Sequence, residues 1–186
     1  ARAKLQKVEF TGNTVFSEGK LRKAIRTRRA WWRYIFRWGN YYNRDLAVVD
    51  KDLLRQAYTE EGYLDFAVAE VAESFSANGK WVTVTYRLEE GSQYTVSAVS
   101  LAGNERFSAE ELMPLVKTQP GDIYRTSAEE RDTESLRRVY EPLGYLDLRC
   151  FPVHNRDPQA RTVAVVHQFR EGEPSHIRDV LIVGNT

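Results

Sequence analysis

The chain has 186 residues, of which 42% are hydrophobic and 28% charged, a balance typical of one ordinary globular domain or two small ones. Its 27 basic and 26 acidic residues leave a net charge of +1, so no field of the whole molecule would attract nucleic acid or a membrane surface. The single cysteine, Cys150, excludes an internal disulfide, and no apolar run approaches the roughly 18 residues of a transmembrane helix. We therefore expect a soluble protein or a soluble piece of a longer one.

The first predicted element is a β-strand. Val8 and Phe10 alternate with less apolar neighbours and run into Gly12 and Asn13, which predicts a strand that ends in a tight turn. A short helix should begin after Ser17. It lacks an acid at its third position and carries a glycine in its first turn, so we expect a weak helix.

An aromatic and basic segment follows at residues 26–38, with five arginines and five aromatic residues. Arginine and tryptophan are enriched where proteins meet partners or lipid headgroups, so the segment is a candidate contact loop. Its candidate residues are Arg28, Arg29, Trp31, Trp32, Arg33, Tyr34, Phe36, Arg37 and Trp38. Two alternatives remain: the loop packs over its own sheet, or its rings stack on single-stranded nucleic acid.

The next predicted element is a long amphipathic helix. Its apolar positions are spaced as one buried face of a helix, and they are Leu46, Val49, Leu53, Leu54, Ala57 and Tyr58. Gly62 and Tyr63 follow, and a glycine just past an amphipathic run is the usual left-handed end of a helix. Two strands at 66–75 and 81–89, joined by an Asn-Gly turn, should complete the unit.

The whole pattern then recurs. The sequence Gly-Tyr-Leu-Asp occurs at residues 62 and 144, and Gly12 and Asn13 reappear as Gly103 and Asn104. Ser108 and Ser127 begin sequences that predict capping boxes for the two helices of the second copy, and the second of these helices should run to Leu143. Strands at 148–154 and 162–170 follow, and another Gly-Asn stands at 184–185.

The duplication indicates a modular array rather than one fused fold. We predict an α+β protein with repeats at 1–92 and 93–173 and the first strand of a truncated repeat at 174–186, each unit being strand, helix, helix, strand, strand. The repeated motifs are interpreted as structural turns, not as catalytic signatures. Their residues are Gly12, Asn13, Gly62, Tyr63, Gly103, Asn104, Gly144 and Tyr145.

Sites for catalysis, metals and cofactors are not evident in the sequence. Cys150 and His154 share a strand face, but a zinc site needs about four ligands, so a packed cysteine and surface histidines are the simpler interpretation. No glycine-rich phosphate loop follows a strand, and paired acids such as Glu89 and Glu90 are interpreted as solvated charge. We expect no enzyme, no metal and no cofactor.

The order of these motifs resembles the POTRA domain, in tandem. The motifs are the Gly-Asn turn, the Tyr-x-x-x-Gly-Tyr helix end at 58–63 and 140–145, and the Glu-Gly at 90–91 and 171–172. The resemblance implies a three-stranded mixed sheet covered by two helices in each unit. It also implies a place in the periplasmic arm of a BamA-type outer-membrane protein assembly factor, ahead of a membrane β-barrel.

In this family the strand after the Gly-Tyr motif is implied to be an exposed sheet edge, which can accept an extended client as an added strand. The candidate edge residues are Phe66, Val68, Glu70, Ala72 and Phe75 in the first unit, and Leu148 and Cys150 in the second. Pro152 supports the edge position, because proline in a sheet is tolerated essentially only at an edge or a bulge. It offers no N–H, so the first unit should be the better strand acceptor.

The implied function is non-catalytic handling of unfolded outer-membrane proteins in the periplasm. The implied partners are those clients, accessory lipoproteins of the assembly complex, adjacent POTRA domains and a C-terminal β-barrel, with no nucleic acid. The alternative keeps the fold but makes the chain a rigid spacer in a two-partner or other transport β-barrel protein, without client binding.

Overall fold

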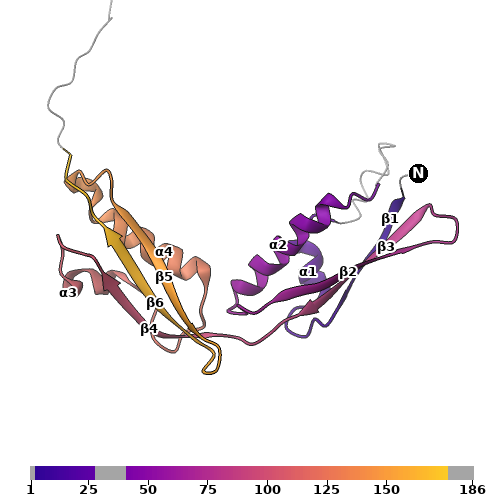
Figure 1. Ribbon diagram of the computed structural model, residues 1–186, viewed down its shortest axis with the longest axis horizontal. Helices are drawn as coiled ribbons and strands as arrows, with labels where there is room; N and C mark the ends of the chain where they lie inside the picture. Colours follow the sequence, from indigo (N-terminus) through magenta and orange to yellow (C-terminus); the bar gives the residue numbers. More distant parts are fainter. Residues whose placement is uncertain (1–2, 28–40, 176–186) are drawn as a thin grey trace, which may run out of the picture. The chain divides into compact units, whose positions relative to one another are not determined.

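The computed structural model describes residues 3–27 and 41–175 (Figure 1). The chain divides into two compact units, unit 1 ending at Gln93 and unit 2 beginning at Tyr94. The candidate contact loop at 28–38 and the Gly-Asn at 184–185 lie outside the described residues. Within the described ranges, no helix is both long enough and apolar enough to span a bilayer.

Unit 1 is a three-stranded mixed sheet with two helices on one face (Figure 1). Its elements are β1 (Lys4–Thr11), α1 (Glu18–Ala24), α2 (Asp45–Thr59), β2 (Ala67–Phe75) and β3 (Trp81–Glu89). The central strand is β3, which pairs in parallel with β1 and antiparallel with β2. Alternate residues of β3 form the floor of the core, and these are Val82, Val84, Tyr86 and Leu88.

Unit 2 repeats this arrangement. Its elements are β4 (Thr95–Ala102), α3 (Ala109–Leu112), the 3₁₀ helix η2 (Met113–Leu115), α4 (Thr126–Arg138), the 3₁₀ helix η3 (Glu141–Leu143), β5 (Arg149–Asp157) and β6 (Thr162–Arg170). The strand order is β4-β6-β5, with β6 in the centre. The predicted α+β fold with two β-α-α-β-β units is confirmed.

The Gly-Asn turns bring the end of the first strand against the central strand. Gly12 has a φ of +82°, and a Cβ at this position would lie 2.2 Å from the carbonyl oxygen of Leu88. The side-chain amide of Asn13 donates to the carbonyl three residues later at 2.9 Å, which closes the turn. Gly103 and Asn104 repeat both features in unit 2. Only glycine fits the first position of the motif.

The Gly-Tyr sequence ends α2 in a Schellman motif. The N–H of Tyr63 donates to the carbonyl of Tyr58 at 3.0 Å, and the N–H of Gly62 donates to Thr59 at 2.9 Å. Gly62 has a φ of +84°, the left-handed conformation that this motif requires. The helix end therefore has hydrogen-bond partners for its last carbonyls, and the chain turns directly into β2.

The second long helix differs from its prediction at both ends. It was expected to run to Leu143, but α4 ends at Arg138 and η3 follows, because Pro142 has no N–H to continue an α-helix. At its start, Arg125 is the N-cap and makes no side-chain cap, so the capping box predicted at Ser127 is wrong. The capping box at Ser108, by contrast, is confirmed.

The predicted weakness of the first helix is not seen in its length. Ser17 caps α1 through its hydroxyl, as expected, and α1 has seven residues, whereas α3 has only four. The reason is Pro114, which converts the continuation of α3 into the 3₁₀ helix η2.

A tyrosine and a glutamate connect three segments of each unit. In unit 1, Glu90 accepts hydrogen bonds from the N–H groups of Thr14 and Val15, at 2.9 and 3.0 Å, and from the hydroxyl of Tyr58 at 2.6 Å. In unit 2, Glu171 accepts from the hydroxyl of Tyr140 at 2.7 Å and from two N–H groups after the Gly-Asn turn. We call these contacts the tyrosine latches.

The latch corrects the interpretation of Glu90 as a solvated acid. Partial burial of the Glu90 carboxylate raises its pKa, but the hydrogen bonds from Thr14, Tyr58 and Val15 outweigh that effect and lower the pKa overall. The charged form is therefore the one that the fold stabilises. The Tyr58 side chain is fully buried and its own pKa is raised, first by burial and then by the bond to Glu90.

A buried aspartate on each long helix makes a second connection. Asp50 is fully buried and accepts hydrogen bonds from the N–H groups of Arg26 and Thr27 and from the hydroxyl of Tyr86. Asp132 occupies the corresponding place in unit 2 and accepts from two N–H groups that follow η2. The buried face of α2 is consequently rotated from the predicted one: it centres on Asp50 and Leu54, while Val49 is 44% exposed.

The latch predicts a specific loss of stability. Replacing Tyr58 by phenylalanine keeps the ring but removes one donor from a charged acceptor, so we expect the free energy of unfolding to fall by about 1–2 kcal/mol. Tyr63→Phe is the matched control, because the structure shows no hydrogen bond from the Tyr63 hydroxyl to a described residue. Urea denaturation of both variants measures the difference, and equal losses would contradict the latch.

Candidate functional site

The candidate site is the outer edge of β2 and its equivalent, β5. Each is the last strand of its sheet, and no described residue pairs with its outer side. The opposite edges are partly covered. In unit 1 the N–H of Tyr42 donates to Ala3 at 2.9 Å beside the start of β1, and in unit 2 the segment 121–124 pairs with the start of β4. The strands after the Gly-Tyr motifs are thus the open edges of both sheets.

The β2 edge is interrupted by a bulge between Val68 and Glu70, where the register against β3 shifts. Val68 and Val71 pack against the core, whereas Glu70 and Ala72 are exposed. A bulge twists an edge strand and limits its pairing with another chain. The regular part of this edge is therefore residues 70–75, which we call acceptor segment 1.

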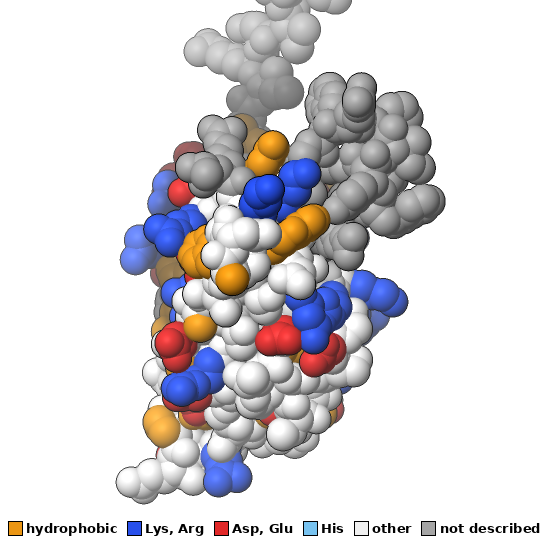
Figure 2. All heavy atoms as spheres, turned by 90° about the vertical axis from the view of Figure 1, so that its right-hand side faces the viewer, with side chains coloured by type: hydrophobic (Ala, Val, Ile, Leu, Met, Phe, Trp, Pro, Cys, Tyr) orange, Lys and Arg blue, Asp and Glu red, His pale blue; other side chains and the backbone are white. Residues whose placement is uncertain are grey.

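Two residues predicted for the first edge lie at its ends. Phe66 precedes β2, is 4% exposed and stacks on Tyr58 with ring centroids 4.0 Å apart, so it belongs to the core. Phe75 is the last residue of β2 and is 50% exposed. Figure 2 views the end of unit 1 that carries the N-terminus and the β2–β3 turn, and it shows hydrophobic side chains interspersed with basic and acidic ones.

The β5 edge is regular but contains a proline. Pro152 pairs with His167 in an unbroken register. Before it, Leu148 precedes the strand and packs against the core, and Cys150 is 9% exposed. Burial raises the pKa of the Cys150 thiol to about 11, so it is a packed, unreactive cysteine. The open part of this edge is residues 153–157, acceptor segment 2.

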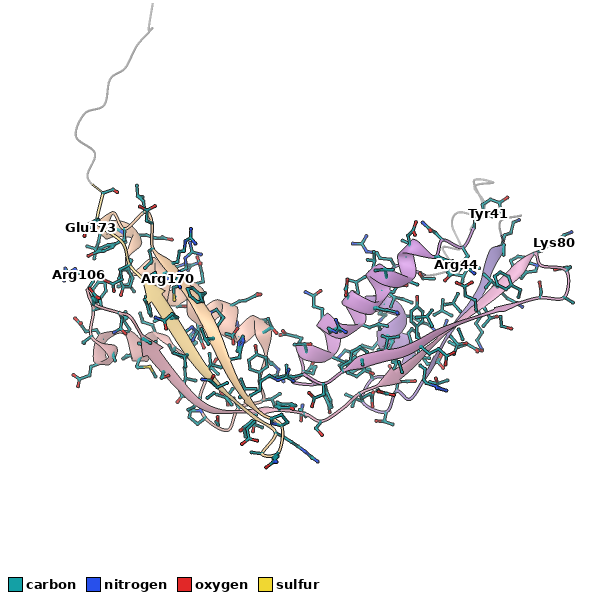
Figure 3. The ribbon with its side chains drawn as sticks, viewed as in Figure 1. Tyr41, Arg44, Lys80, Arg106, Arg170 and Glu173 are labelled. Carbon is teal, nitrogen blue, oxygen red and sulfur yellow. The ribbon has the colours of Figure 1, made fainter. Side chains whose placement is uncertain are left out.

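A polar cluster anchors acceptor segment 1 to the start of α2. Glu73 accepts a hydrogen bond from the hydroxyl of Tyr42 at 3.0 Å and a two-pronged bond from Arg44, with its shorter contact at 2.6 Å. Figure 3 labels Arg44 and the neighbouring Tyr41 at this end of the unit. The bond to Arg44 lowers the pKa of Glu73, against the effect of its partial burial. We call this cluster clasp 1.

A cluster of different chemistry anchors acceptor segment 2. His154 lies 2.5 Å from Glu129 through its Nε2 atom, and the hydroxyl of Tyr124 lies 3.2 Å from both side chains. Glu129 and Tyr124 are each 5% exposed. The hydrogen bond to Glu129 raises the pKa of His154, although burial opposes it. We call this cluster clasp 2.

The interpretation of the histidines as surface residues is wrong for His167 on β6, which is 1% exposed and has a pKa lowered by burial. His154 is exposed, as expected, although it is hydrogen-bonded into clasp 2, and His176 lies outside the described residues. Among the described residues, no three or more His, Cys, Asp or Glu side chains form a group that could hold a metal ion.

The clasps and the buried aspartates were not predicted from the sequence, and the Glu-Gly motifs were identified without the bonds that their glutamates make. The signal that was available is their spacing: Tyr42 and Tyr124 are 82 positions apart, as are Asp50 and Asp132. This is the separation of the two Gly-Tyr-Leu-Asp motifs, so a complete comparison of the repeats would have found these pairs. It would not have identified their hydrogen-bond partners.

Comparison with known proteins gives a family match over most of the chain. The model of the POTRA family, described as a surface antigen variable number repeat, matches residues 3–91 and 94–172. A putative outer membrane protein assembly factor of Treponema pallidum is 29% identical over 184 residues, covering 97% of this chain and 22% of the relative. Outer membrane protein assembly factor BamA of Neorickettsia risticii is 27% identical, covering 98% and 24%. The chain thus spans about a quarter of the length of these relatives.

Solved structures share the fold. The POTRA3-5 structure of Haemophilus influenzae BamA is matched with a TM-score of 0.71 at 22% identity, covering all of this chain and 73% of that one. BamA of Haemophilus ducreyi lacking POTRA domains 1-3 is matched with a TM-score of 0.64 at 15% identity, covering 91% and 29%.

The open edge predicts where proline is tolerated. Val71 pairs with Tyr86 as Pro152 pairs with His167, so Val71→Pro places a proline at the equivalent edge position. We expect this variant to fold with a loss of about 1–2 kcal/mol, from reduced packing. Val84→Pro in the central strand should abolish folding, because it removes a ladder bond and distorts a strand paired on both sides. Circular dichroism melts compare the two, and unfolding of Val71→Pro would contradict the edge assignment.

Proposed function

The chain belongs to the POTRA family of surface antigen variable number repeats, and from this premise we propose that it is a non-catalytic, periplasmic client-binding module of an outer-membrane protein assembly factor. It binds unfolded outer-membrane proteins by adding one of their segments as a fourth strand to the open edge of a sheet. Accessory lipoproteins of the assembly machinery and a membrane β-barrel of the same protein are its further proposed partners.

The observation that carries the proposal is the same open edge in both units. Strands β2 and β5 have their inner sides paired and their outer sides without a partner among the described residues, while the start of each opposite edge is covered. An added strand gains affinity from backbone hydrogen bonds, so it can recognise many sequences. That breadth suits a module that handles unrelated unfolded chains.

The proposal ranks the two edges. Acceptor segment 1 is six residues long and contains no proline, and several of its side chains are small or polar. Acceptor segment 2 is five residues long and lies directly after Pro152, which cannot donate a hydrogen bond to a client. The bulge in β2 shortens the first edge, but segment 1 keeps a regular register against β3, so each of its outward-pointing residues retains an N–H for a client. Unit 1 should therefore bind the client strand more tightly.

The test is an NMR titration with a synthetic peptide that carries the alternating apolar sequence of an outer-membrane barrel strand. Backbone N–H groups of a strand point alternately inward and outward, so every second amide of residues 70–75 should shift and gain protection from hydrogen exchange. The control is the same peptide with alternate backbone nitrogens methylated, which keeps its side chains but cannot pair. Equal binding of both peptides would rule out strand addition.

Exchanging valine and proline between the two edges tests the predicted ranking of their affinities. Val71→Pro removes one edge N–H from unit 1, so affinity at this edge should fall about five- to tenfold, the value of one backbone hydrogen bond. Pro152→Val supplies that N–H in unit 2 and should raise affinity there by a similar factor. If neither edge responds to peptide, the chain acts as a rigid spacer; if binding is strong but falls steeply with salt, recognition is electrostatic instead.

A further inference from the structure

The two clasps occupy the same place in the repeated fold. Glu73 pairs with Val84 on β3, and His154 pairs with Val165 on β6. These two valines are 81 positions apart, which is also the separation of the first residues of β3 and β6. Each clasp therefore holds the acceptor segment of its own unit, at an equivalent residue.

Their tyrosines are equivalent as well, but their charges are reversed. Tyr42 and Tyr124 each contact the clasped residue of the edge strand through the hydroxyl, at 3.0 and 3.2 Å. In unit 1 the strand supplies the acid, Glu73, and the start of α2 supplies an arginine. In unit 2 the strand supplies a base, His154, and α4 supplies the buried acid Glu129.

This reversal changes how the clasps respond to protons. An arginine stays protonated at every pH at which proteins fold, and Glu73 has a lowered pKa, so clasp 1 keeps both charges above the acid range. Histidine is the side chain whose charge changes near neutrality, so clasp 2 is a full ion pair only when His154 is protonated. The charges of clasp 1 in unit 1 are therefore permanent near neutral pH, whereas those of clasp 2 in unit 2 depend on the protonation of His154.

The charged and titratable groups around His154 are consistent with an ion pair that depends on its protonation. Glu129 on α4 and Tyr124 before α4 face it directly, and Arg156 lies two residues further along β5. Glu129 raises the pKa of His154, whereas burial and Arg156 lower it, and the net shift is upward. His167 on β6 is buried and its pKa is lowered, so this histidine stays neutral where His154 is charged.

We propose that Tyr124, Glu129 and His154 form a proton-operated clasp that fixes the outer half of β5 to α4 near neutral pH and loosens it as the pH rises. Clasp 1 holds β2 unchanged over the same range. The latch and the Gly-Asn turn do not require this difference, because they are alike in both units. The second unit is thus the pH-sensitive one.

The direction of the pH dependence follows from the linkage between protonation and folding stability. Because the pKa of His154 is raised on folding, its contribution to stability is fully present below the ordinary value of 6.5 and is lost as the pH rises through the raised value. The lowered pKa of His167 acts only in the opposite range, where stability falls as the pH drops below 6.5. Measurements between pH 6.5 and 8.5 therefore isolate clasp 2.

This inference also deepens the proposed function, and its effect on client binding rests on that function. A client strand pairs best with an acceptor strand that is already ordered, because ordering on binding costs free energy. Loosening of residues 153–157 should therefore weaken peptide binding at unit 2 as the pH rises. Binding at residues 70–75 should not change.

The experiment is hydrogen exchange of the 186-residue chain at pH 6.5 and 8.5, with protection factors corrected for the intrinsic exchange rate at each pH. Protection of the amides of 153–157 should fall about three- to tenfold at pH 8.5, the value of one hydrogen bond, because the charged bond between His154 and Glu129 is lost when His154 deprotonates. Protection of 70–75 should change by less than about twofold, which makes unit 1 the internal control.

Two variants separate the clasp from general fold stability. His154→Phe should give low protection of 153–157 at both pH values, because no ion pair can form. His154→Arg should give high protection at both, since its cation is permanent and can still reach Glu129. A pH-dependent fall that persists in His154→Phe, or that appears equally in 70–75, would overturn the proposal.

Peptide titration of the same samples distinguishes the two conclusions. If exchange follows the expected pattern but the barrel-strand peptide binds neither edge, the clasp stands and the client-binding function fails. If the peptide binds both edges while protection of 153–157 is independent of pH, client binding stands and the clasp is refuted.

Discussion

Each unit depends on a buried tyrosine near the end of its long helix. Tyr58 is fully buried, stacks on Phe66 and bonds through its hydroxyl to Glu90, which in turn holds the backbone after the Gly-Asn turn. One residue thereby ties the helix to the end of the central strand and to the segment that follows the first strand. Tyr140 and Glu171 do the same in unit 2.

The latch also explains why the motifs occur together. The glycine after Glu90 has a φ of +69°, and a Cβ there would lie 2.8 Å from the Cβ of Asp65. The Asp of Gly-Tyr-Leu-Asp therefore packs directly over the Gly of Glu-Gly, and Gly172 and Asp147 make the same approach in unit 2. The Gly-Tyr-Leu-Asp motif and the Glu-Gly motif therefore lie in contact and form one junction in each unit.

Much of this fold could be predicted from the sequence, because its signals are local. The alternation in 81–89 predicted the core face of β3, and the glycines of the repeated motifs lie at positions with a positive φ. The early ends of α3 and α4 have local causes, Pro114 and Pro142, but other errors have physical causes that are not local. The helical spacing of apolar residues predicts Val49 on the buried face, yet Asp50 lies there because three donors from other segments meet it. The bulge in β2 could not be predicted, because this strand contains no glycine or proline.

The two units share the turns, the latch and the buried aspartate but differ in their clasps, and this contrast bears on function. The turns, latch and buried aspartate are chemically alike in the two units because each satisfies backbone groups that any sequence with this fold exposes. The clasps hold side chains at the open edges, where the fold sets the position but not the chemistry. A duplicated scaffold can therefore change the charge, proline content and pH response of its edges without altering its core. At the strands proposed to bind a client, the units differ in their bulge, their proline and the charges of their clasps.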